Sequence, residues 1–210
     1  MDPSAIARSI VTHPKTGVDV LSISDGISAA PASLAIELKH LLLLQGQYDY
    51  VVVDTSGTLS DPVVSVLDAS HLIFLVSKCN LPSLRNVQKV LNAFERLGYS
   101  QSRVRLLINR YNKGEDISVK EIEKALKFNV FWWIPNDYKT MIRSIQSGVP
   151  LTTNQYSSEP LAKSFYAMAS QIVGIEVKDP TDAPKSGLLV RVRESSAKSL
   201  PITSLNLLKN

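Results

Sequence analysis

Hydrophobic residues along the chain gather in short runs that have no polar face, and these runs alternate with amphipathic stretches. Runs of β-branched and aliphatic residues without a polar face are typical of strands buried on both sides of a parallel sheet. They predict strands at residues 50–54, 71–77, 104–109 and 130–134, and the alternating pattern of residues 18–23 predicts a further strand. Because these runs have no polar face, we expect Val52, Phe74, Leu106 and Leu107 to lie in the core.

The amphipathic stretches between the runs predict helices with recognisable ends. Helices are predicted at residues 31–44, 83–97, 118–127, 138–146 and 159–173. A further helix of about two turns is predicted to start at Asp61, which would be its N-cap. Pro31 and Pro62 suit first helical positions, and glycines follow several of the predicted ends. Residues 1–17 carry only a weak helical pattern and then a turn. The alternation of strand and helix predicts an α/β fold, a three-layer αβα sandwich with a mostly parallel sheet.

A single domain is expected over residues 1–174. The chain has 210 residues, 44% of them hydrophobic, which is enough for one sizeable core. After Gly174 the periodicity fades, and Pro180, Pro184 and scattered serines predict a flexible tail over residues 175–210.

Composition excludes several classes of protein. The single cysteine, Cys79, allows no internal disulfide and fits a reducing compartment, and the three histidines show no zinc-ligand spacing. The first residues lack the apolar region of a signal peptide, and no apolar run is long enough to span a bilayer. We therefore expect a cytoplasmic protein without a transmembrane segment. The net charge of +4 is mild and gives little support for nucleic-acid binding.

The candidate chemistry lies where the Val51–Val53 run ends, in the stretch YDYVVVDTSG. Asp54 follows the run directly, and two hydroxyl residues and Gly57 come next. An acid at the carboxyl edge of a parallel strand can help to hold the Mg²⁺ ion and the attacking water of a nucleotide hydrolase. The alternative is an aspartate that only caps the following turn or helix.

The order of several motifs resembles one family. The segment HPKTGVDVL is followed by YDYVVVD, LPSLRN, RVRLLINRYN and IPNDYKTMIRSIQSGVPL. Over roughly residues 5–174 this order is similar to the ParA/MinD (deviant Walker A) P-loop ATPases, and within them to the CpaE/TadZ-like pilus-assembly branch. The resemblance implies a P-loop NTPase-like fold, ATP and Mg²⁺ as cofactors, a homodimer and partners in a Tad (type IV-class) pilus machine. It also implies a cytoplasmic protein, peripheral at the inner face of the membrane.

The resemblance also assigns roles to individual residues. Asp54 matches the catalytic acid, which acts on Mg²⁺ through water. Asn109 matches the asparagine that binds the adenine edge, and Pro135, Asn136 and Asp137 match the loop beside the base. Two simpler interpretations stay open: Asn109 as a turn residue bonded to its own backbone, and Pro135 as a strand terminator.

The chain departs from the family at the phosphate site. A P-loop needs clustered glycines and a lysine to hold phosphates, yet the nine glycines are scattered and no G-x-x-x-x-G-K-[ST] or KGGxGKT motif occurs. We interpret the chain as a fragment lacking the N-terminal P-loop portion, with a degenerate paralogue as the alternative. The absent first strand should leave a gap beside residues 51–54. ATP hydrolysis by this chain alone is not expected.

Two other functions remain as alternatives. One is a non-catalytic interaction module with the same fold. The other is a partition-type ATPase remnant that binds DNA through Lys78, Arg85, Lys89 and Arg96. Charges of this kind are typical of a solvated helix face, so nucleic acid is not the favoured partner. The final segment SLPITSLNLLKN is too short and too weakly basic for a membrane-anchoring helix.

Overall fold

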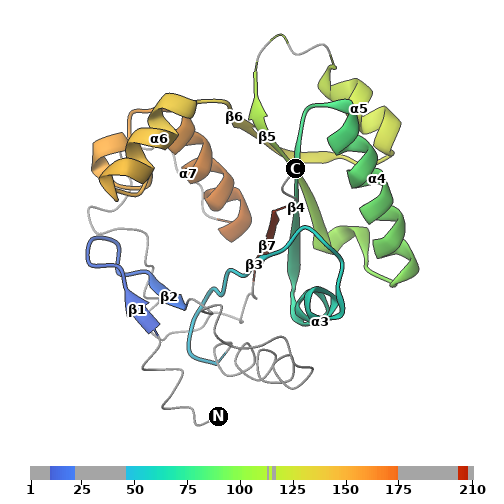
Figure 1. Cartoon of the computed structure of the whole chain (residues 1–210), viewed down its shortest axis with the longest axis horizontal. Helices are drawn as coiled ribbons and strands as arrows, with labels where there is room; N and C mark the ends of the chain where they lie inside the picture. The colour runs from blue at the N-terminus through green and yellow to red at the C-terminus, as the bar shows by residue number, and fades with distance from the viewer. Residues whose placement is uncertain (1–9, 22–45, 113, 115–116, 175–202, 208–210) are drawn as a thin grey trace.

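The computed structural model describes residues 10–21, 46–112, 114, 117–174 and 203–207. At its centre is a five-stranded sheet with the order β3-β7-β4-β5-β6, in which all neighbouring strands are parallel (Figure 1). The strands are β3 (Asp54–Thr55), β4 (Leu72–Lys78), β5 (Val104–Tyr111), β6 (Val130–Pro135) and β7 (Thr203–Leu207).

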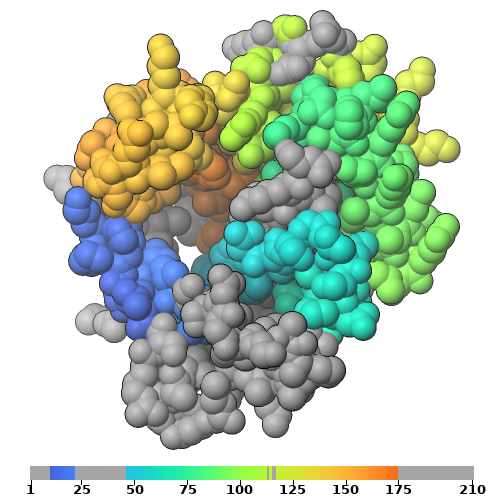
Figure 2. All heavy atoms as spheres, in the orientation of Figure 1, coloured from blue at the N-terminus to red at the C-terminus, as the bar shows by residue number. Residues whose placement is uncertain are grey.

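Helices cover both faces of the sheet. On one side lie α3 (Asp61–Ala69), α4 (Leu81–Arg96) and α5 (Val119–Leu126), and on the other lie α6 (Tyr138–Ser147) and α7 (Pro160–Val173). In the space-filling view the two groups of helices occupy opposite sides of the molecule (Figure 2). Short 3₁₀ turns at Gln101–Arg103 and Asn154–Tyr156 complete the connections. The predicted three-layer αβα sandwich is confirmed.

The core divides between the two faces of the sheet, as the side-chain alternation of a strand requires. In β4, Ile73 and Leu75 pack in the cluster that α3, α4 and α5 cover. Phe74 and Val76, one residue out of phase, pack in a second cluster with α7 side chains at its border. Burial of Phe74, Leu106 and Leu107 is confirmed, with 2% or less of each residue exposed.

Polar caps start and end the helices near where the sequence predicted them. The Asn80 side chain accepts a hydrogen bond of 2.9 Å from the Ser83 N–H and so begins α4. Ser118 and Glu121 form a reciprocal capping box at the start of α5. At α3 the N-cap is Ser60 rather than the predicted Asp61, which is the first helical residue. Pro62 is therefore the second helical residue of α3.

The N-terminal described segment corrects two predictions. Residues 10–12, predicted as weakly helical, form β1 (Ile10–Thr12), which pairs antiparallel with β2 (Asp19–Leu21) in a separate two-stranded sheet. The predicted strand at 18–23 is therefore not part of the main sheet. A tight turn explains this: the Gly17 N–H donates to the His13 carbonyl oxygen at 2.8 Å, with Gly17 at φ 68°. The turn brings the two short segments side by side, so that they pair with each other.

The prediction that Val52 lies in the core is wrong. The strand predicted over residues 50–54 is reduced to Asp54–Thr55, at the edge of the sheet. Val52 is 63% exposed and Tyr50 is 40% exposed, whereas Val51 and Val53 are half-buried. Residues 50–53 lie at the edge of the sheet, just before the paired residues Asp54 and Thr55, and only one of their faces is covered. Because side chains alternate between the two faces of an extended segment, every second side chain is exposed to solvent.

Some predictions fall on residues that the structure does not describe. The predicted helix at 31–44 lies outside the described residues, as do residues 175–202 and 208–210 of the predicted tail. Residues 203–207, also assigned to that tail, instead form β7 between β3 and β4. The gap expected beside residues 51–54 is thus filled by a strand, which provides hydrogen-bond partners for the backbones on both sides. The division of the chain at Gly174 stays a prediction.

Two valines that look alike in sequence should respond differently to truncation. Val76→Ala should lower the free energy of unfolding by about 2 kcal/mol, because it removes two methyl groups from a tightly packed site. Val52→Ala is the matched control and should cost less than about 0.5 kcal/mol, because the side chain is mostly exposed. Urea denaturation of both variants measures the difference, and equal losses would contradict the exposed position of Val52.

Candidate functional site

The carboxyl ends of the parallel strands define the candidate site. In the sheet register Lys78, the last residue of β4, lies opposite Asn109, and Tyr111, the last residue of β5, lies opposite Pro135. Loops that follow parallel strands at this edge are where open α/β sheets bind their ligands. Two of the predicted site elements, Asn109 and the loop Pro135–Asp137, therefore start from neighbouring strand ends.

A backbone hydrogen bond joins these two elements directly. The N–H of Asn136 donates to the carbonyl oxygen of Tyr111 at 2.9 Å, which holds the loop after β6 against the end of β5. Asn136 is exposed, whereas Asn109 and Pro135 are half-buried. The structure thus brings Asn109 together with Pro135 and Asn136, in a position open to a ligand.

The end of β5 contains a bulge at Asn109. The paired residues advance by three along β5, from Ile108 to Tyr111, while they advance by two along β6, from Trp133 to Pro135. Arg110 has a φ of 55° in the left-handed region, and its N–H donates to the Asn109 side-chain oxygen Oδ1 at 2.9 Å. The bond to its own backbone that the sequence left open for Asn109 is therefore present.

The Asp137 side chain is used by the fold. Its Oδ1 accepts a hydrogen bond of 3.1 Å from the Thr140 N–H, which makes Asp137 the N-cap of α6. Hydrogen bonds from Thr140, assisted by the positive charges of Arg143 and Lys139, hold the pKa of Asp137 below its ordinary value. The carboxylate therefore fixes the start of α6, and the backbone of the loop is what remains to border a ligand.

Asp54 does not converge with the other candidate residues. The register places Asp54 level with Phe74 of β4, four residues before Lys78. At roughly 3.3 Å per residue and 4.8 Å between strands, Asp54 is about 13 Å below and about 14 Å beside Asn109. The expected convergence holds for Asn109 and the Pro135–Asp137 loop and fails for Asp54, because β3 joins the sheet at a lower level than the ends of β4 and β5.

The described residues fit only part of a nucleotide. The Asn109 amide and the adjacent loop backbone offer polar groups that suit a heterocyclic base. In the part of the chain that the structure describes, no three Asp, Glu, His or Cys side chains gather as a metal site, and Asp54 is exposed. Together with the absence of a P-loop motif from the sequence, this donor set does not fit Mg²⁺ and a triphosphate. None of the helices among the described residues has the length and apolar character needed to cross a membrane.

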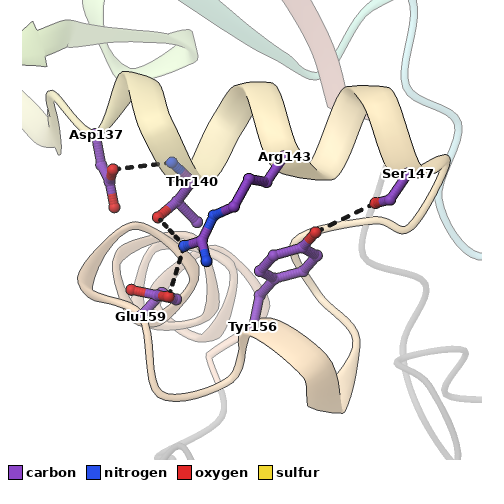
Figure 3. A network of polar contacts seen from close by, with 6 residues as sticks. All are labelled: Asp137, Thr140, Arg143, Ser147, Tyr156 and Glu159. Atoms are coloured by element: carbon purple, nitrogen blue, oxygen red, sulfur yellow. Dashed lines mark hydrogen bonds and ion pairs between the residues drawn. The ribbon is translucent and has the colours of Figure 1, made fainter.

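Sequence reasoning missed a polar cluster behind the loop (Figure 3). Nη2 of Arg143 donates to Thr140 Oγ1 at 3.1 Å and to Glu159 Oε1 at 2.9 Å, and the Ser147 and Tyr156 hydroxyls are 3.2 Å apart. A pocket of about 470 Å³ is lined by Arg143, Gln146, Ser147, Gln155, Tyr156 and Glu159. The Asp137, Thr140 and Arg143 spacing of three residues on one helix face was the available signal.

This cluster links α6 to the start of α7. The Arg143 side chain is 59% exposed, so its ion pair with Glu159 adds little stability by itself. Its geometric effect is larger, because Thr140 connects the pair to Asp137. The loop at the candidate site is therefore held from behind by contacts that reach α7.

Comparison with known proteins places this arrangement in a known fold. No protein-family model matches the chain. The septum site-determining protein MinD of Thermotoga maritima is 24% identical over 132 residues, which are 60% of this chain and 48% of that protein. The aligned part thus spans about half the length of this relative.

Solved structures agree with this assignment of the fold. A ParA family ATPase from Chlorobium tepidum superposes with a TM-score of 0.68 at 23% identity, over 80% of this chain and 70% of that one. The cell division ATPase MinD of Pyrococcus furiosus gives 0.65 at 19% identity, over 80% and 70% of the two chains. MinD in the MinC:MinD complex of Aquifex aeolicus gives 0.65 at 17% identity, over 82% and 69%. The chain has the fold of the ParA/MinD ATPases.

The N-cap at the candidate loop gives a pH-dependent prediction. Asp137→Ala should lower the free energy of unfolding by about 1 kcal/mol at pH 7, because the Thr140 N–H loses its acceptor. The pKa of Asp137 is lowered in the folded state, so its stabilising effect is present above the usual pKa of about 3.9 and is lost as the pH falls through the folded value.

The difference between wild type and Asp137→Ala should therefore shrink as the pH is lowered from 7 to 3. Asp137→Asn, which keeps a side-chain oxygen acceptor, is the matched control and should lose less at pH 7. Urea denaturation at the two pH values measures both effects. A gap that is the same at pH 7 and pH 3 would show that the Asp137 charge does not stabilise α6.

Proposed function

Because the chain has the fold of the ParA and MinD ATPases, we propose that it is a CpaE/TadZ-like protein that helps to position or assemble a Tad (type IV-class) pilus machine. The order and place of its motifs support this proposal. LPSLRN opens α4 directly after β4, and IPND joins β6 to α6. LPSLRN thus begins the helix that follows the carboxyl end of one parallel strand, and IPND spans the carboxyl end of another, at the edge where this type of sheet interacts with ligands and partners.

At the level of the site, we propose weak binding of a purine nucleoside. The single observation that carries this proposal is the contact between the β5 end and the loop after β6, made by the Asn136 N–H and the Tyr111 carbonyl oxygen. This contact puts the Asn109 amide next to the loop backbone. Such a pair of polar elements can hydrogen-bond a base edge, while the loop carries Pro135 as an apolar border.

ATP hydrolysis by this chain alone is not part of the proposal. Phosphoryl transfer is catalysed by cations and hydrogen-bond donors positioned around the transferred group. By resemblance Asp54 is the acid beside Mg²⁺ and water, but here it lies roughly 20 Å from Asn109, as the strand and residue spacings imply. Without a phosphate cradle between them, the base contacts and the acid cannot act on one nucleotide.

The partners are proposed from the family and from one relative. MinD of Aquifex aeolicus is found in a complex with MinC, so a protein of this fold can bind a second protein. For this chain we infer a partner in the pilus-assembly machinery, together with self-association as a homodimer and a peripheral position at the inner face of the membrane. A non-catalytic interaction module is compatible with the same contacts, and the lack of a P-loop motif favours it.

A titration tests the nucleotide part of the proposal. Adenosine, ADP and ATP with Mg²⁺ should bind the purified chain weakly and within about fivefold of one another, a spread of roughly 1 kcal/mol. Asp54→Ala should leave all three affinities unchanged. A strong preference for ATP that Asp54→Ala removes, or phosphate release that depends on Asp54, would mean that the chain holds a phosphate site.

A cellular experiment tests the pilus role separately. Deleting the gene should reduce the number of assembled pili or displace them from their usual position in the cell, and the wild-type gene should restore both. The Val52→Ala variant, which changes a mostly exposed side chain outside the Asn109 and Pro135–Asp137 elements, serves as a control for expression. Unchanged pili in the deletion strain, counted by electron microscopy, would overturn the role in pilus assembly.

A further inference from the structure

One side of α6 carries an exposed apolar stripe. Tyr138 is 63% exposed and Ile145 is 65% exposed, and the half-buried Ile142 lies between them. The spacings of four and three residues put these three residues on the same side of the helix. Hydrophobic side chains that are exposed one at a time are common, whereas a row of them on one helix is typical of a surface that binds another protein.

The stripe continues into the pocket between α6 and the start of α7. Gln146 lies four residues after Ile142 and three residues after Arg143, so it is next to both on the surface of the helix. Arg143 and Gln146 belong to the lining of the pocket of about 470 Å³. An apolar stripe and a polar pocket are therefore adjacent, and we call the two together the α6 face.

The pocket contains hydrogen-bonding groups that the protein itself does not use. A guanidinium group has five N–H donors. Nη2 of Arg143 donates to Thr140 and Glu159 (Figure 3), and in the described part of the chain no acceptor faces Nη1 or Nε. The exposed side-chain amides of Gln146 and Gln155 make no hydrogen bond with any described residue. These groups can still bind a ligand.

The charges around the pocket favour an acidic ligand. Lys139 lies one helical turn before Arg143 and is exposed. Lys163, which is exposed too, lies one helical turn after Glu159 on α7. Three positive side chains therefore surround a pocket whose lining holds one carboxylate, that of Glu159. Complementary charge of this kind selects a binding partner that carries acidic side chains.

The ion pair in the pocket can be exchanged for a contact with an incoming carboxylate. The side chains of Arg143 and Glu159 are 59% and 32% exposed, and an ion pair this exposed contributes little to stability. Glu159 reaches the guanidinium through one contact, between Oε1 and Nη2. A ligand carboxylate that binds two guanidinium N–H groups at once forms a stronger contact. The exchange therefore keeps the charge of Arg143 paired.

We propose that the α6 face binds an acidic amphipathic helix of a partner protein, whose carboxylate replaces Glu159 at Arg143 and whose apolar side chains cover Tyr138 and Ile145. The stripe is about 10 Å long, two helical turns, which matches a ligand helix with apolar residues at i, i+4 and i+7. Binding of this helix does not require a nucleoside. As the contact for an assembly partner, it rests on the proposed role in pilus assembly and adds the chemical class of that partner.

Synthetic peptides test the inference on the full chain. The first peptide is an amphipathic helix of about four turns with leucines on one face and glutamates beside them. The second has glutamine in place of each glutamate, and the third has serine in place of each leucine. The first should bind and shift the NMR signals of Tyr138, Arg143 and Ile145, and the other two should bind at least about fivefold more weakly. Equal affinities of the first two peptides, or no shifts on α6, would overturn the inference.

Substitutions in the ion pair test the exchange. Arg143→Gln should weaken binding of the acidic peptide by about fivefold or more, because the carboxylate loses its partner. Glu159→Gln removes the competing carboxylate, so it should strengthen that binding by about twofold or more and leave the glutamine peptide unaffected. Weaker binding in Glu159→Gln would contradict the exchange. The thermal midpoints of both variants should stay near that of wild type, since the pair is exposed.

Arg96→Gln is the matched control for charge. It also removes one exposed positive charge, but at the end of α4, on the opposite side of the sheet. Affinity for the acidic peptide should stay within about twofold of wild type. A loss as large as in Arg143→Gln would mean that the net charge of the chain attracts the peptide, and would overturn a specific site.

Sedimentation tests whether a second copy of the chain covers the stripe instead. The oligomeric state should be the same for wild type and Ile145→Ser, and a dimer that Ile145→Ser dissociates would overturn the proposal. The pilus role is tested separately by the deletion strain. Peptide binding together with unchanged pili in that strain would keep the α6 face and refute the pilus role, and a pilus defect without peptide binding would do the reverse.

Discussion

The parallel pairing of β4 with β5 is the interaction on which the rest of the structure depends. Six residue pairs lie in unbroken register, from Ile73 opposite Val104 to Lys78 opposite Asn109. Both strands are covered by helices on both faces, so the hydrogen bonds of this pair are shielded from water and a slip by one residue would exchange the two core clusters. The register is thereby fixed. It determines that Lys78, at the end of β4, lies opposite Asn109 of β5.

The position of the candidate site follows from this register. Because β4 ends at Lys78, opposite Asn109, and β5 continues only to Tyr111, Asn109 lies near the carboxyl edge of the sheet, and β6 brings Pro135 to the same edge one strand away. The Asn136 N–H and the N-cap of α6 then hold the loop in place. These contacts hold Asn109 and the loop after β6 in a fixed relative position.

The surroundings of Asp54 are organised differently. Asp54 belongs to a strand of two residues that, in the part of the chain that the structure describes, is at the edge of the sheet and pairs with β7. An acid held in this way is exposed and lies well below the level of Asn109. The fold of the ParA/MinD ATPases is thus present with the candidate site residues separated into two parts. Because of this separation, we propose that the chain binds a purine nucleoside and do not propose that it hydrolyses ATP by itself.

The local sequence was enough to predict the strands that are buried on both faces along their whole length. Runs such as 104–109 have no polar face, so any stable fold must bury them on both sides, and their strands appear where expected. Helix ends with a chemical signal, such as the capping box of Ser118 and Glu121, also appear where expected. The family resemblance selected Asn109 and Pro135–Asp137 as candidates, and the direction of parallel strands then predicted that they share one edge of the sheet.

Only the tertiary structure decided the features that depend on residues distant in the chain. The three valines of residues 51–53 read like a buried strand, yet the burial of Val52 depends on neighbours that the sequence cannot place, and it is exposed. The pairing of β2 with β1, the insertion of β7 and the Arg143–Glu159 contact have the same origin. The direction of the Asn109 amide was undetermined too, because a side chain that both donates and accepts is oriented only by the groups around it.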